Sequence, residues 1–299
     1  MATVADLVLR VEEILYGTEV WERPDTDLLN GAITDSATSM LVDTDIWRRQ
    51  DYAEFAAADG TPGEIVFVRA YNTSTNTATV ERGQRGSTAA AQSDNAVIRR
   101  NPVITRQAID QKLQEMIDTP GRLWPHVWTW YQGSLTFTTD DHLYDLPQYI
   151  EDVVAVYQSD VDSDGQFAPI DSGHWEVIRQ LSTSVTANKT LLRLADVWDE
   201  NTTVYYTGKR RPFYADIANI DATLANMLPR AVAGLLLMDR GPQIDGSSRK
   251  AGRDRGTNLF SYGQSLYEQF RRDLDEYRRA LTVEHAKEPN FKRRMSARW

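Results

Sequence analysis

Apolar residues recur three or four positions apart in four segments of the chain, which is the spacing of an amphipathic helix. These segments are residues 3–16, 105–118, 224–239 and 259–283. The last one has an apolar stripe of about 25 residues, made of Leu259, Tyr262, Leu266, Phe270, Leu274, Tyr277 and Leu281. Because helices with one wide apolar stripe can pack against one another, the pattern predicts a bundle of about four helices.

The segment between the first two helices has the shorter periodicity of strands. Residues 63–72 and 77–83 are joined by the turn sequence TSTN, which predicts a β-hairpin. Residues 32–44 and 96–98 supply further strand candidates. We expect residues 23–101 to form a small all-β domain inserted into a helical pair, since such insertions cost little closure entropy.

A second β region is expected at about 122–214, with strand candidates at 135–140, 152–158, 191–197 and 202–208. The predicted fold class is therefore α+β. Residues 1–22 and 102–299 would form the helical-bundle core with its β region, and 23–101 the inserted all-β domain. A C-terminal arm would occupy 284–299.

Composition narrows the class of protein. The chain has 299 residues, a net charge of −10 and no cysteine, which excludes disulfide frameworks, cysteine zinc sites and thiol catalysis. Its longest nearly apolar stretch, residues 231–238, is far shorter than the ~18–20 residues of a membrane span. We expect no membrane span and no signal peptide.

The charge is unevenly distributed. Residues 287–299 hold five cations and one anion, a net +4, which leaves −14 for the rest of the chain. Such an acidic body is a poor general binder of nucleic acid, because phosphates need cations. Phe291, Met295 and Trp299 alternate with the cations, and Pro289 stops any helix from upstream. We expect an arm that docks on an acidic partner; the alternative is a solvated, disordered end.

No set of residues predicts catalysis. The histidines lack the spacing of a helical metal pair and the context of a serine nucleophile, and we expect ordinary polar or packing roles for His126, His142, His174 and His285. Phosphate-binding glycine motifs are also missing from the sequence. We expect no enzymatic activity and no cofactor.

One acidic run resembles a calcium loop. Asp160, Asp162, Asp164 and Gly165 match the start of a D-x-D-x-D-G loop, and Asp171 falls at its twelfth position. However, calcium loops prefer a bidentate glutamate there, and the flanking residues have strand character. We expect an acidic turn, with a weak calcium site as the alternative.

Three tryptophans lie close together at Trp124, Trp128 and Trp130. Exposed indole rings could stack on sugars or bases. We expect instead that they fill the junction between the bundle and the sheet.

Two segments resemble proteins of tailed bacteriophages. Residues 32–98 contain a GE-I strand and end in the pattern R-G-x-x-G-[ST]-x-A-A, here Arg82, Gly83, Gly86, Ser87, Thr88, Ala89, Ala90 and Ala91, with Gln92 where histidine is common. This segment resembles a β module of phage structural proteins. Residues 104–157 carry a helix, the tryptophan cluster and the sequence YDLP at 144–147 before a valine-rich strand. They are similar to the head-to-tail adaptor (connector, or head completion) proteins of short-tailed phages.

The resemblance implies a virion structural protein made in the host cytoplasm and located at the portal vertex. Such adaptors form a homo-oligomeric ring, commonly dodecameric, that docks under the portal protein. The ring extends the DNA channel and offers an attachment surface to the next tail component, a nozzle or tail tube. Double-stranded DNA would pass without sequence specificity, and an acidic wall would let it slide.

The resemblance also gives roles to two groups of residues. The portal-docking arm would consist of Phe291, Lys292, Arg293, Arg294, Met295, Arg298 and Trp299. The side of the last helix opposite its apolar stripe would pair neighbouring subunits of the ring through Arg271, Arg272, Asp275, Arg278 and Arg279, unless it is simply a solvated face. The alternative functions are a tail-tube, nozzle or tail-terminator component, and a carbohydrate-binding module for host recognition that uses the tryptophans.

Overall fold

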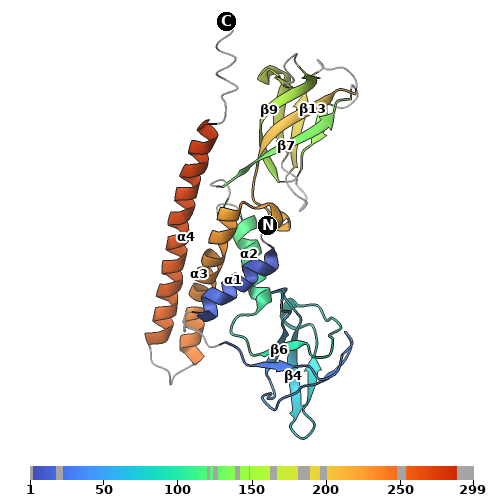
Figure 1. Ribbon diagram of the computed structural model, residues 1–299, viewed down its shortest axis with the longest axis vertical. Coiled ribbons are helices and arrows are strands. Elements are labelled where there is room, and N and C mark those ends of the chain that lie inside the picture. Colours follow the sequence, from blue (N-terminus) through green and yellow to red (C-terminus); the bar gives the residue numbers. More distant parts are fainter. Residues whose placement is uncertain are drawn as a thin grey trace. The chain divides into compact units, whose positions relative to one another are not determined.

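A computed structural model describes most of the chain. The described residues are 3–17, 23–119, 122–123, 127–138, 142–147, 149–161, 167–180, 189–195, 201–247 and 254–287. They form two compact units, of which the first combines residues 1–116 with 217–299 and the second spans residues 117–216. Each unit is treated by itself below (Figure 1).

The described residues form four α-helices, which belong to the first unit except for the last two residues of α2: α1 (Val4–Gly17), α2 (Arg106–Asp118), α3 (Ala222–Ser247) and α4 (Asp254–Lys287). These confirm the four helices predicted from the apolar spacing. At the start of α1 a capping box forms, in which the Thr3 hydroxyl accepts from the Asp6 amide (3.1 Å) and the Thr3 amide donates to the Asp6 carboxylate (3.0 Å).

The helices α3 and α4 pack side by side (Figure 1), and their backbones approach closely at two glycines. A Cβ atom on Gly234 would lie 2.7 Å from the carbonyl oxygen of Gly263, and the reverse distance is also 2.7 Å. Elsewhere along this pair of helices, Arg230 Nη1 lies 2.6 Å from Asp273 Oδ2. One side of α4 is thereby fixed against α3.

Six short strands of the first unit form one antiparallel sheet, in the order β1–β6–β3–β4–β5–β2. Their bounds are β1 (Thr26–Leu28), β2 (Ser39–Leu41), β3 (Tyr52–Phe55), β4 (Ile65–Asn72), β5 (Thr77–Glu81) and β6 (Val97–Arg100). A bridge between Leu29 and Val42 joins the chain just after the two edge strands. The sheet therefore curls back on itself around an apolar core that includes Trp47, Phe55 and Val68. We call β1–β6 the curled sheet.

The second unit has two sheets that share one core. One sheet has the order β10–β9–β13–β7 and the other β11–β12–β8. The bounds are β7 (Thr129–Thr136), β8 (Leu143–Asp145), β9 (Ile150–Val161), β10 (Phe167–Pro169), β11 (Trp175–Gln180), β12 (Lys189–Leu194) and β13 (Thr203–Arg210). Val156 and Tyr206 of the first sheet pack with Leu192 and Leu194 of the second in this core.

The predicted fold class is wrong. The described chain is mostly β, with six-, four- and three-stranded sheets and four helices, and it is not a helical bundle with a small inserted β domain. The strands were underestimated because several are only three or four residues long, and such runs carry little periodicity. The domain boundaries remain predictions. Within the described residues, no helix combines the length and apolar character needed to cross a membrane.

Candidate interaction surface

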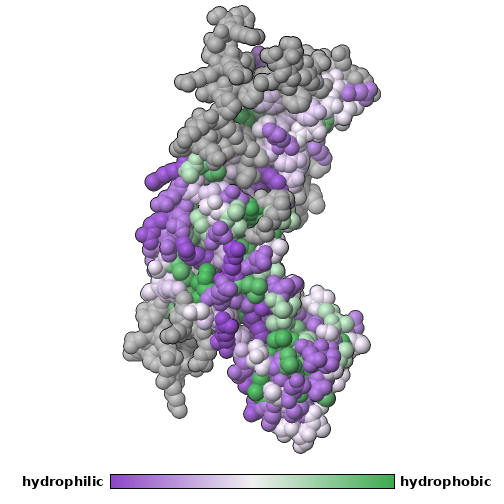
Figure 2. Space-filling view, viewed as in Figure 1, coloured by the Kyte–Doolittle hydropathy of each residue, from purple (hydrophilic) through white to green (hydrophobic). Residues whose placement is uncertain are grey.

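The side of α4 that faces away from α3 is polar and charged along its length. Arg271, Arg272, Asp275, Arg278 and Arg279 are all exposed. These are the residues that the sequence assigned to a subunit interface, and the structure brings them together on one side of one helix. Figure 2 shows hydrophilic side chains along the edge of the molecule where α4 lies in Figure 1.

The geometry of an α-helix explains this placement. At 100° per residue, Glu268, Arg272, Asp275 and Arg279 fall within about 60° of one another around the axis, opposite the buried Phe270. Both signs of charge alternate along this strip, so it does not offer the uniform positive surface that a phosphate backbone needs. Its chemistry suits a protein surface that also carries both signs.

Neighbouring charges on α4 are also close enough to pair within the helix. Glu268 precedes Arg272 by four residues, a favourable spacing and order for an intrahelical ion pair. Gln264 Nε2 also donates to Glu268 Oε1 at 2.9 Å. Contacts of this kind are those of a solvated face, which is the alternative role for the strip.

The predicted portal-docking arm lies outside the described residues. This applies to Phe291, Lys292, Arg293, Arg294, Met295, Arg298 and Trp299. Their assignment remains a prediction.

The candidate calcium loop is only partly described. Asp162 and Asp164 lie outside the described residues, and Asp160 is known only as a backbone position in β9. The carboxylate of Asp171 accepts from the Gly173 amide at 3.1 Å and caps a short 3₁₀ turn. Among the described residues there is no group of three or more side chains that could hold a metal ion.

The tryptophan cluster is partly described as well. Trp124 and the side chain of Trp130 lie outside the described residues. Trp128 is half-buried, and Lys209 Nζ lies 5.0 Å from the centre of its ring. One face of this indole is thus engaged by a cation.

Two histidines that the sequence assigned to ordinary polar roles line the same cavity in the second unit. His142 and His174 flank the end of β12, where their carbonyl oxygens accept from the amides of Leu194 (3.0 Å) and Ala195 (2.9 Å). The cavity measures about 330 Å³ and is also lined by Trp175, Glu176 and Arg193. Such a lining can bind polar groups, but the walls supply no serine, cysteine or lysine nucleophile.

The motif that suggested a phage β module has a structural role. The carboxylate of Glu64 is buried and accepts from Arg82 Nε (2.7 Å) and Nη2 (2.5 Å), and from the amides of Gly83 (2.9 Å) and Ala90 (3.1 Å). Gly83 and Gly86 adopt positive φ angles of 60° and 84°, which favours glycine. The motif therefore fixes the loop between β5 and β6.

Buried charges also join α1 and α2 to the curled sheet, a feature that the sequence reasoning missed. Arg99 of β6 pairs with Glu54 of β3 (3.0 Å) and with Glu12 of α1. At the first residue of α2, the Arg106 amide donates to Glu54 Oε1 (2.6 Å) and Arg106 Nε lies 3.1 Å from Glu12 Oε1. We call Glu12, Glu54, Arg99 and Arg106 the charged joint.

Burial shapes the electrostatics of the charged joint. It raises the pKa of Glu54 above 4.5, although the positive charge of Arg99 acts in the opposite direction. Burial alone would lower the pKa of Arg99, but Glu54 and Glu12 outweigh it and raise that pKa. Beside the joint, burial raises the pKa of Tyr16 to about 12, and the Tyr16 hydroxyl donates to the Ile104 carbonyl (3.2 Å).

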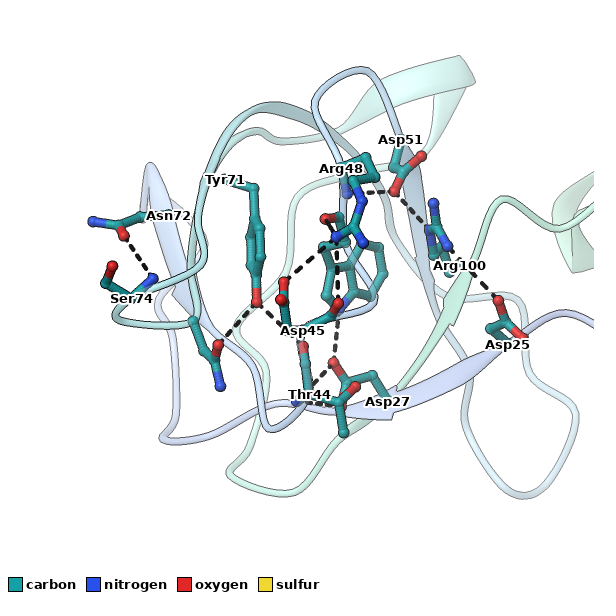
Figure 3. Close-up of polar contacts among 12 residues, drawn as sticks. Asp25, Asp27, Thr44, Asp45, Arg48, Asp51, Tyr71, Asn72, Ser74 and Arg100 are labelled. Carbon is teal, nitrogen blue, oxygen red and sulfur yellow. Dashed lines mark hydrogen bonds and ion pairs between the residues drawn. The ribbon is translucent and has the colours of Figure 1, made fainter.

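Carboxylates also hold the loops of the curled sheet (Figure 3). Asp27 accepts from the indole of Trp47 (2.7 Å) and from the Thr44 amide (3.2 Å). Asp51 accepts from Arg100 Nε (2.6 Å) and from the Arg48 amide (2.7 Å). These carboxylates already make hydrogen bonds and ion pairs within the chain. The exposed strip on α4 is therefore the better candidate for contact with other molecules.

Comparison with known proteins gives no family. No family model matches the chain, and a search of curated proteins finds no relative.

Proposed function

We propose that this chain is a virion structural protein, a head-to-tail adaptor that assembles as a ring under the portal of a tailed phage. The resemblance of residues 32–98 and 104–157 to phage proteins supports this proposal, and so does the role of Glu64 and Arg82 in fixing the loop of the shared motif. In the ring, the protein would extend the DNA channel and offer a surface to the next tail component.

The observation that carries the proposal is the exposed strip of α4. A ring needs two different surfaces on each subunit that fit each other and close. The helix is fixed on α3 by its buried side, through the contact of Gly234 with Gly263 and the pair of Arg230 with Asp273. Its other side presents charges of both signs, including Arg278.

The first test is ring formation on the portal. The full-length chain, incubated with the purified portal protein of the same virion, is expected to give ring-shaped complexes by negative-stain microscopy. The variant R278E/R279E should lose these complexes. The control R49E/R193E makes the same change of charge at two exposed positions outside α4 and should keep them. Rings that form equally well with R278E/R279E would contradict the role of α4.

A second test concerns the arm. Truncation after Val283 removes the cationic and aromatic residues of the tail, and the shortened chain is expected to fold but to lose binding to the portal. Circular dichroism verifies the fold, and co-sedimentation with portal-bearing heads measures binding. If the truncated chain binds as well as the full chain, the arm is not the docking element. Binding to purified tail protein instead of portal would favour the tail-component alternative.

A further inference from the structure

Between Glu268 and Arg279, most of the exposed charges of α4 are symmetric about the centre of this segment, with opposite signs. The midpoint is the peptide bond between Asp273 and Leu274. At equal distances on either side of it, three acidic residues match three basic ones: Arg272 with Asp275, Arg271 with Glu276, and Glu268 with Arg279. All six side chains are exposed.

This pattern is self-complementary when a second copy of the same helix lies antiparallel to the first and in register with it. When two copies lie antiparallel around a two-fold axis through the midpoint, Glu268 faces Arg279 and Arg272 faces Asp275, and each of these two pairs occurs twice. Arg271 and Glu276 lie about 140° apart around the helix axis and flank the contact on opposite sides. A parallel arrangement in register would place each residue beside its own copy, so that like charges face each other.

The reach of the side chains agrees with this arrangement. Packed helix axes lie 8–10 Å apart, a distance that arginine and glutamate side chains bridge easily. Glu268, Arg272, Asp275 and Arg279 point within about 60° of one direction, away from α3. The strip is therefore accessible to another helix along its length.

We propose that α4 of one copy pairs antiparallel with α4 of a second copy of this chain through this strip. The contact is built from exposed charges, so it is weak and sensitive to salt. It differs from a ring contact because a two-fold interface uses the same surface on both subunits and closes after two copies.

The pairing would also regulate assembly. A subunit whose strip is covered by a second copy cannot use that strip to contact a neighbour in a ring. Dimer formation would therefore keep the free protein from assembling into rings before it meets the portal. This consequence rests on the proposed adaptor function, whereas the pairing itself does not. The experiments below use the free protein without portal, so their failure is distinct from failure of the proposed function.

The decisive experiment is a charge exchange measured by analytical ultracentrifugation in low and high salt. The wild-type chain is expected to form a dimer in low salt that dissociates in high salt. E268R places two arginines opposite each other and should raise the dissociation constant at least about tenfold. E268R/R279E restores opposite charges between copies and should return the dissociation constant close to that of the wild type.

The exchange reports on contacts between copies only. Residues 268 and 279 lie about 16 Å apart along one helix, so they cannot compensate each other within a copy. The matched control E268R/R278E makes the same total change of charge but exchanges the wrong pair, and it should remain dissociated. A wild-type monomer in low salt, a dimer indifferent to E268R, or a failure of E268R/R279E to restore it would each overturn the proposal.

A cross-link tests the orientation. The chain has no cysteine, so E268C/R279C introduces the only thiols. Under oxidising conditions this variant is expected to give a covalent dimer, because the antiparallel arrangement brings position 268 of one copy opposite position 279 of the other. E268C alone should remain uncross-linked, since its two copies are about 16 Å apart. A cross-link in E268C alone, or none in E268C/R279C, would contradict the antiparallel arrangement.

Discussion

The curled sheet of the first unit and the paired sheets of the second unit use polar groups in opposite ways. In the curled sheet, buried carboxylates bind backbone amides and guanidinium groups, as Glu64 and Asp27 do. In the second unit, phenol rings fill the core and its edge: Tyr131 lies 5.9 Å from Tyr149 and 6.2 Å from Tyr206, centre to centre. The stability of the curled sheet therefore depends on the geometry and charge of its polar contacts. The stability of the second unit depends on how well its rings fill the core.

This difference teaches where each structure is vulnerable. A buried carboxylate that loses its partners, or partners that lose their carboxylate, leaves uncompensated charge in a low-dielectric site. An aromatic core is instead destabilised when a larger neighbouring side chain overlaps with the volume of a ring. Burial raises the pKa of Tyr206 to about 12. Neutralising substitutions should therefore damage the curled sheet most, and steric ones the second unit.

The largest effect is expected for E64A. The substitution removes the carboxylate that pairs with the buried Arg82 guanidinium and that accepts from the amides of Gly83 and Ala90. We expect a loss of about 3–5 kcal/mol in the free energy of unfolding, measured by urea denaturation. The control E81A removes an exposed partner of Arg69 and should cost no more than about 1 kcal/mol. Equal losses for the two variants would break the comparison.

The second effect is steric and lies in the second unit. A Cβ atom on Gly133 would lie 2.5 Å from the ring and hydroxyl of Tyr206 and 2.9 Å from Tyr131. G133A should therefore cost about 1–3 kcal/mol, although alanine normally suits a strand better than glycine. G173A, whose nearest contact would be 3.9 Å away, serves as the control and should be nearly neutral. If G133A leaves the free energy of unfolding unchanged, this core tolerates added volume.

The third effect is a pH dependence that comes from Glu54. Its raised pKa means that the folded chain binds this proton more tightly than the unfolded chain does. The stabilisation of the fold by this proton is fully present below pH 4.5, and it is lost as the pH rises through the raised pKa of Glu54. The unfolding free energy of the wild type relative to E54Q should therefore fall with rising pH, by at most about 1.4 kcal/mol per pH unit. Parallel pH profiles of the two proteins would show that Glu54 does not titrate in this range.

The smallest effect is expected for R210M in the second unit. Arg210 lies 4.3 Å above the ring of Tyr149 and pairs with Asp216. Methionine keeps most of the apolar stem but removes the charge, so the loss should be about 0.5–1 kcal/mol in thermal or urea unfolding. A loss as large as that of E64A would mean that the second unit also depends on charge.

Helices and one hairpin were predictable from the sequence because their signals are local. The apolar stripe through Phe270 and Leu274 predicts α4, and the turn at 73–76 between two alternating runs predicts the hairpin of β4 and β5. Both are confirmed by the structure. Their type depends on neighbours in the sequence and not on the rest of the fold.

The strands that were missed depend on distant partners. The strand β3 carries Glu54 at a fully buried position, which an apolar pattern cannot anticipate. Its carboxylate is acceptable there only because Arg99 and the Arg106 amide meet it, 45 and 52 residues further along the chain. The exposed strip on α4 could be placed from the sequence because helical periodicity alone locates it, whereas its partner in an assembly remains a prediction.

The charged joint has a mechanical consequence for the first unit. Ion pairs and hydrogen bonds resist sliding because they hold only at particular distances and angles. Next to them Gly60, with φ +91°, lies so close to α1 that an added Cβ would come within 2.5 Å of the Ala5 carbonyl oxygen. Separating α1 or α2 from the curled sheet would therefore break several buried polar contacts together with this close backbone approach.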